Sequence, residues 1–160
     1  MHYVSDNINI DNSFFFSEIS KNHKIKLNTM KFFTLTELCH SATAIEYGID
    51  NTPSEELVKN IELLVEKILD PAREQLGQPI YVNCCFRNKE VNKLVGGVKN
   101  SQHCMGLAAD IWSKDMKKLW EILSKMDFDQ LIRYSTFYHI SYNGDRNRKQ
   151  IIMKDTSKMK

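Results

Sequence analysis

The clearest periodic segment of the chain follows Ser54, which has the character of a helix N-cap. Apolar residues then recur every three or four positions and fall on one face of a helix, while charged residues fall on the other. The apolar face consists of Leu57, Ile61, Leu64, Val65 and Ile68. We expect Pro71 to interrupt or kink the end of this helix and Gly77 to stop any turn that continues.

Three shorter helices are predicted from weaker signals. Thr34 and Glu37 are spaced as a capping box, in which two side chains satisfy free amide groups at a helix start. Residues 88–94 fit one short helix, and the glycine pair at 96–97 marks a turn after it. The third helix starts near residues 114–115, and its apolar face comprises Leu119, Ile122, Leu123 and Met126.

Runs of β-branched and aromatic residues predict strands at 79–85, 108–113, 128–134, 137–142 and about 149–153. In the second run, alternation places Ala108, Asp110 and Trp112 on one face. Asn143-Gly144 has the sequence of a tight hairpin turn between the last two strands. Together these elements predict an α+β fold, with helices packed on a mostly antiparallel sheet.

The composition is that of one globular domain. The chain has 160 residues, of which 42% are hydrophobic and 26% charged, with a net charge of +2. This weak charge gives no reason to expect a nucleic acid partner. The chain contains no run of 18 apolar residues, so no membrane span is predicted. The first residues lack the features of a secretory signal peptide because charged residues interrupt them. A monomer is expected.

The four cysteines, Cys39, Cys84, Cys85 and Cys104, have spacings that suit no small disulfide scaffold, so reduced thiols are expected. A zinc site built from the last three cysteines and His103 is an alternative, as is thiol redox chemistry at the adjacent pair. Both are disfavoured because the chain has no C-x-x-C pair.

The segment Ser101–Asp110 carries the strongest chemical signal. It reads SQHCMGLAAD and joins His103 to Asp110 through a glycine turn. An imidazole nitrogen and a carboxylate oxygen both bind zinc, and catalytic zinc sites commonly have three protein ligands and a water. His139, inside the predicted strand 137–142, is the candidate third ligand.

The pattern S-x-H-x-x-G-x-A-x-D with a later strand histidine resembles the M15 family of zinc D-Ala-D-Ala carboxypeptidases and endopeptidases, which share the hedgehog fold. Other segments extend the resemblance, mainly to small phage and bacterial members, over roughly residues 31–153. These segments are FTLTEL from Phe33, GIDNTP from Gly48, LDPAR from Leu69, VGGVKNSQH from Val95, FDQLI from Phe128 and Asn147-Arg148. The resemblance implies a peptidase-like domain at 30–154, an N-terminal appendage at 1–29 and a tail at 155–160. For the appendage, a flexible arm, a docking segment and an over-extended gene start remain open.

The resemblance implies one zinc ion bound by His103, Asp110 and His139. Arg87, in Cys84-Cys85-Phe86-Arg87, matches the arginine of the family's S-G-Y-R segment. It is expected to stabilise an oxyanion or bind a substrate carboxylate. Ser101 and Gln102 are expected to orient the histidine or bind the substrate backbone.

The implied activity is hydrolysis of peptidoglycan stem peptides, as a D-Ala-D-Ala carboxypeptidase or an endolysin-type endopeptidase. In a phage lysis system, the protein would be made in the bacterial cytoplasm, released with the help of a holin, and would act at the cell wall.

One departure from the family pattern bears on catalysis. The small members usually carry a glutamate between the D-Q-L-I segment and the second histidine, but Leu131–Tyr138 contains no acidic residue, and Tyr134 stands in the expected place. Loss of a positioned base costs about 10²–10⁴ in rate. Glu90, Asp129 and Asp145 are the alternative acids. The competing hypothesis is a zinc-stabilised, catalytically impaired module that binds the cell wall or forms part of a virion.

Overall fold

The computed structural model describes residues 30–154. The predicted appendage at 1–29 and tail at 155–160 lie outside the described residues, so this division of the chain stays a prediction.

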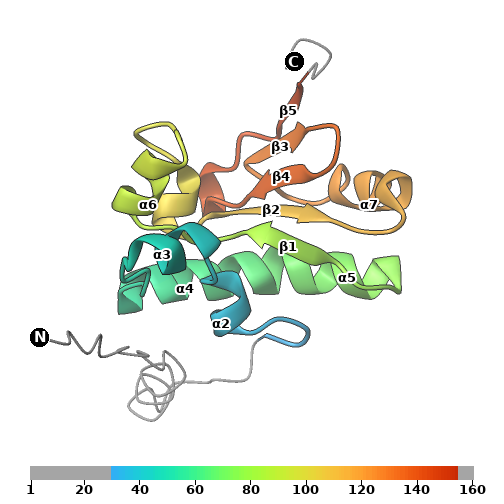
Figure 1. The fold of residues 1–160 in the computed structure, drawn as a ribbon. Helices are drawn as coiled ribbons and strands as arrows, with labels where there is room; N and C mark the ends of the chain where they lie inside the picture. The colour runs from blue at the N-terminus through green and yellow to red at the C-terminus, as the bar shows by residue number, and fades with distance from the viewer. Residues whose placement is uncertain (1–29, 155–160) are drawn as a thin grey trace, which may run out of the picture.

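Five short strands form one sheet beside a layer of helices (Figure 1). The strands are β1 (Tyr81–Cys84), β2 (Ala108–Trp112), β3 (Gln130–Arg133), β4 (Tyr138–Ser141) and β5 (Gln150–Met153). Their order across the sheet is β1-β2-β4-β3-β5, and every neighbouring pair is antiparallel except β3 with β5. The predicted α+β fold with a mostly antiparallel sheet is confirmed.

The predicted hairpin at Asn143-Gly144 is wrong. β4 already has β2 on one side and β3 on the other, so no edge is left for β5. The chain instead forms a 3-10 turn, η3 (Gly144–Arg146), and crosses to the far side of β3, where β5 runs parallel to it. Backbone bonds from Lys149 N to Phe128 O and from Gln150 N to Asp129 O fix this crossing.

The long helix continues through Pro71 rather than stopping before it. α4 (Glu55–Leu64) leads into a π-helical turn, η1 (Val65–Leu69), and then into α5 (Asp70–Leu76). In the wide turn Asp70 N donates to Val65 O, five residues back. Proline lacks an amide hydrogen and cannot complete the α-helical hydrogen-bond pattern. The wider π-helical turn just before Pro71 lets the helix continue past it. Gly77 ends the helix with φ 72°, as expected.

The apolar face of this long helix is buried against the sheet. Ile61, Leu64 and Ile68 belong to the same buried cluster as Ile111 and Ile140. In β2, Ala109 and Ile111 therefore face the helices, and the alternating residues Asp110 and Trp112 are only half-buried. The sheet thus has a core face and a second face that carries Asp110.

The shorter helices begin at side-chain caps. Thr34 accepts from Glu37 N at the start of α2 (Leu35–Leu38), which confirms the predicted N-terminus. Asn88 and Asp115 do the same for α6 (Lys89–Leu94) and α7 (Met116–Leu123). The sequence reasoning missed α3 (Ala42–Tyr47), which Ser41 caps. Within the described residues, no helix has the length and apolar character needed to cross a membrane.

Candidate metal centre

Three strands place one row of side chains across the sheet. Cys84 on β1 pairs with Asp110 on β2, and Asp110 pairs with His139 on β4. Residues directly opposite each other in antiparallel strands lie on the same face. The pairing therefore brings Asp110 and His139 together, although they are 29 residues apart in the chain, and His139 Nδ1 lies 2.9 Å from Asp110 Oδ1.

His103 reaches the same carboxylate from a turn. It lies in a 3-10 turn, η2 (Gln102–Met105), which Gly106 closes with φ 67°. A Cβ at Gly106 would stand 2.8 Å from the Leu57 carbonyl oxygen, so both the backbone angle and the close approach to α4 require glycine. The turn directs His103 Nε2 to 3.3 Å from Asp110 Oδ1.

The donor set at this point fits a metal cation. His103 Nδ1 lies 2.7 Å from the Cys85 carbonyl oxygen, which can only accept, so Nδ1 carries the hydrogen and Nε2 is left to bind. Nε2 then faces a carboxylate oxygen, and only a proton or a cation between them satisfies both atoms. A carbonyl that orients a ligating imidazole is a common feature of metal sites. His103, Asp110 and His139 therefore meet in the arrangement that the sequence predicts.

The electrostatics of the two central groups are tightly linked. Burial lowers the pKa of His103, but hydrogen bonds with Asp110 and Cys84 outweigh it and raise that pKa to about 10. Burial alone would raise the pKa of Asp110, whereas its contacts with His103 and His139 hold it well below the usual range. Asp110 is thus a carboxylate at neutral pH, as a metal ligand must be.

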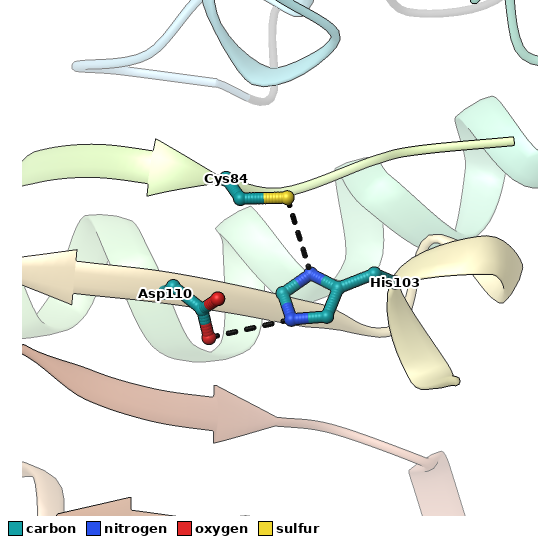
Figure 2. Close-up of side chains that lie close together, drawn as sticks. All are labelled: Cys84, His103 and Asp110. Atoms are coloured by element: carbon teal, nitrogen blue, oxygen red, sulfur yellow. Dashed lines mark hydrogen bonds and ion pairs between the residues drawn. The ribbon is translucent and has the colours of Figure 1, made fainter. Parts of the chain in front are cut away.

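Cys84 lies close to His103 and Asp110 (Figure 2), although the sequence placed it only in the disfavoured cysteine site. Its Sγ lies 3.7 Å from His103 Nδ1, and the ligand atoms of Cys84, His103 and Asp110 all lie within 4.8 Å of one another. The disfavoured site of Cys84, Cys85, Cys104 and His103 is not assembled among the described residues: Cys85 is fully buried in the apolar core, and of the three cysteines only Cys84 groups with His103. A β-bulge between Val82 and Cys84 brings Cys84 opposite Asp110, and strand alternation alone does not reveal a bulge.

Arg87 stands beside this row rather than in it. Its Nη1 donates to Cys84 Sγ at 3.6 Å and its Nε donates to Asn92 Oδ1 at 3.0 Å. Its backbone N also bonds to His103 O at 3.4 Å. No ion pair of Arg87 is present among residues 30–154, so its charge is available to an anionic group near the site.

The sequence of residues 31–141 matches the profile of the Peptidase M15 family. The chain belongs to the M15 peptidase family. No curated protein sequence matches it. Membership agrees with the α+β fold of the chain.

This M15 chain has no carboxylate in the place of the missing glutamate. Tyr134 follows β3 and stacks on Phe137, with ring centroids 4.5 Å apart. Burial and the negative charge of Asp110 both raise the pKa of Tyr134. Among the alternative acids, Glu90 is exposed on α6 and Asp145 is exposed on η3.

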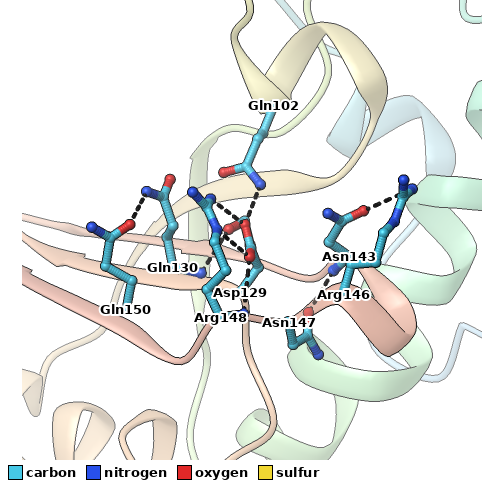
Figure 3. A network of polar contacts seen from close by, with 9 residues as sticks. Gln102, Asp129, Gln130, Asn143, Arg146, Asn147, Arg148 and Gln150 are labelled. Atoms are coloured by element: carbon cyan, nitrogen blue, oxygen red, sulfur yellow. Dashed lines mark hydrogen bonds and ion pairs between the residues drawn. The ribbon is translucent and has the colours of Figure 1, made fainter.

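Asp129, the third alternative acid, is fully committed to a polar network (Figure 3). It is completely buried. Arg148 donates to it twice from the side chain, at 2.7 Å each, and once from the backbone at 3.1 Å. Gln102 Nε2 donates to the remaining lone pair of Oδ2 at 2.7 Å. Asp129 therefore holds the start of β3 and is not placed to act as a base.

The same network explains the position of the histidine turn. Gln102 directly precedes His103, and its amide ties η2 to the buried carboxylate of Asp129. Ser101 is buried at the start of the turn. The bond from Gln102 favours the expected orienting role of that residue, whereas the role of Ser101 and the contact of both residues with substrate stay predictions.

We expect Gln102→Ala to weaken zinc binding by about tenfold, because η2 loses its link to Asp129. This is the lower end of the effect seen when a residue that supports a metal ligand is removed. Competition with a chelator of known affinity measures this. Gln130→Ala is the matched control, since Gln130 donates to exposed Gln150 instead. A fall in thermal stability with unchanged zinc affinity would show that Gln102 serves the fold alone.

Proposed function

We propose that this M15 family member is a zinc-dependent peptidase that hydrolyses the stem peptides of peptidoglycan. The observation that carries the proposal is the convergence of His103 Nε2 and His139 Nδ1 on one oxygen of Asp110. Two imidazoles and a carboxylate form a three-ligand set of the catalytic zinc type. The substrate is proposed from the family resemblance, as a D-Ala-D-Ala carboxypeptidase or an endopeptidase.

The chemistry assigns a role to each residue. His103, Asp110 and His139 hold one zinc ion, which when bound acts as a Lewis acid toward a carbonyl and lowers the pKa of water. Arg87 binds a substrate carboxylate or stabilises negative charge that develops on the carbonyl oxygen. Tyr134 is the candidate for moving a proton at its hydroxyl in place of the missing glutamate.

We also propose that the protein acts in a phage lysis system. A phage lysis system would have the protein made in the bacterial cytoplasm, released with the help of a holin, and active at the cell wall as a monomer.

A second candidate function is a zinc-stabilised module that binds the cell wall without cutting it. Two observations favour it: the site has no carboxylate assigned as a base, and Cys84 lies in the same row of side chains as Asp110 and His139 and contacts His103. Zinc sites with four protein ligands are closed and structural, whereas catalytic ones keep an open position. Thiolate binding by Cys84 would complete such a closed set.

Turnover of isolated peptidoglycan tests the two candidates. The full chain is stripped of metal with a chelator, assayed, and assayed again after one equivalent of zinc is restored. We expect new amine and carboxyl termini only in the zinc-restored sample, and a His139→Ala variant should release none. Stoichiometric zinc with no new termini would overturn the peptidase proposal, and retention on the insoluble wall would then support the binding module.

A further inference from the structure

A cleft of about 830 Å³ opens beside the candidate metal centre. This volume is within the range of small-molecule sites. One wall comes from α2, the start of α3 and the residues between them, and the other comes from β1 and α6. The lining includes Val82, Asn83 and Cys84 of β1, as well as Arg87. Because Cys84 lines the cleft and also contacts His103, the cleft adjoins the metal centre.

The wall that β1 contributes to the cleft is an outer edge of the sheet. β1 is the first strand in the sheet order and pairs only with β2. Within residues 30–154, no backbone hydrogen bond joins β1 to another element on its outer side. An edge strand presents unpaired amide and carbonyl groups, and an extended peptide can add to them as a further strand.

The charges along the cleft select the kind of peptide. Arg87 lines one wall, and Glu37 on α2 lines the other as its single acidic residue. Glu37 is exposed and forms no ion pair with any residue that the structure describes. A ligand with a carboxylate near Arg87 and an ammonium group near Glu37 would complement both walls.

We infer that the cleft binds an extended peptide along the edge of β1, with an ammonium group of the peptide paired to Glu37. The inference rests on the proposed peptidase function and makes it more specific. It assigns the α2–α3 wall to the recognition of a cationic residue on the substrate, away from the bond that is cut.

Binding of two uncleavable peptides to the zinc-loaded full chain tests this inference. The first is Nα-acetyl-L-Lys-D-Ala-D-Ala with the amide nitrogens between residues replaced by methylene groups, and the second carries an additional acetyl group on the lysine side chain. Calorimetry at low salt should give about fivefold tighter binding of the first peptide, the upper range for an exposed ion pair. Glu37→Gln should remove this difference.

Glu46→Gln is the matched control, because Glu46 is exposed on α3 but does not line the cleft. It should keep the fivefold difference. Hydrogen exchange at the amides of β1 should slow when the first peptide binds. Equal affinity for both peptides in the unaltered chain, loss of discrimination in the control, or unchanged exchange in β1 would each overturn the inference. If Glu37 distinguished the two peptides but the protein cut no peptidoglycan, only the proposed peptidase activity would be contradicted.

Discussion

Asp110→Ala is expected to abolish tight zinc binding. One oxygen of Asp110 faces both histidine nitrogens, at 3.3 Å and 2.9 Å, so its removal separates the two remaining ligands and removes the only negative charge among them. We expect the affinity for zinc to fall by more than about 100-fold. Removal of a residue that only supports a ligand costs up to about 100-fold, and Asp110 is itself a proposed ligand. Metal content after dialysis and chelator competition measure the loss.

Asp145→Ala is the control for this change, because Asp145 is an exposed carboxylate on η3. It should bind one zinc ion with unchanged affinity. If Asp110→Ala retained one tightly bound zinc ion, Asp110 would not be a required ligand, and zinc would be held by Cys84 with the two histidines or at another site in the chain.

Asp129→Asn is expected to cause the largest loss of stability, about 3 kcal/mol in the free energy of unfolding. The carboxylate is fully buried and accepts from Arg148 and Gln102, and removing one member of a buried charged pair costs about 3–5 kcal/mol. The estimate is at the low end because the Arg148 side chain is 56% exposed and can be hydrated. Urea unfolding at pH 7 with excess chelator excludes any contribution from zinc.

The pH dependence of this loss identifies its electrostatic origin. Hydrogen bonds from Arg148 lower the pKa of Asp129 below its usual value of 3.8. A lowered folded-state pKa gives stability that is present above the unfolded-state pKa and is lost as the pH falls through the folded-state value. The difference between the two proteins should therefore be constant near neutrality and shrink below about pH 4.

The matched control is Asp127→Asn, since Asp127 is exposed and its ion pair with Lys149 spans 3.6 Å. Its effect should stay within about 0.5 kcal/mol, as for most surface substitutions. A difference between Asp129→Asn and the unaltered protein that persisted undiminished to low pH would mean that packing, rather than charge, accounts for the loss.

Local patterns in the sequence predict much of the fold. The spacing of Ile61, Leu64 and Ile68 correctly predicts the buried face of the long helix, because helical periodicity is a property of neighbouring residues. The partner of β5 could not be predicted in the same way. A tight-turn sequence at Asn143-Gly144 favours a hairpin, but β4 already has a strand on each side, and this depends on the whole sheet.

The same distinction applies to the candidate site. His103, Asp110 and His139 could be named because a short motif and a strand histidine are visible in the sequence. Cys84 was named only within a disfavoured cysteine site, and its place opposite Asp110 could not be predicted because it depends on a bulge in β1. An orienting role for Gln102 was expected, but its partner Asp129, 27 residues away in the chain, could not be identified from the sequence.

The direct pairing of Asp110 with His139 constrains how this chain can change over time. A shift of one residue in either strand would turn one proposed ligand toward the core, so the spacing inside β2 and β4 is fixed. The segment between β2 and β4 includes α7 and β3, and the loops within it can change in length without moving either ligand. Insertions and deletions should therefore accumulate in the turns around α7 and be excluded from the two strands, even if substitutions are frequent in both.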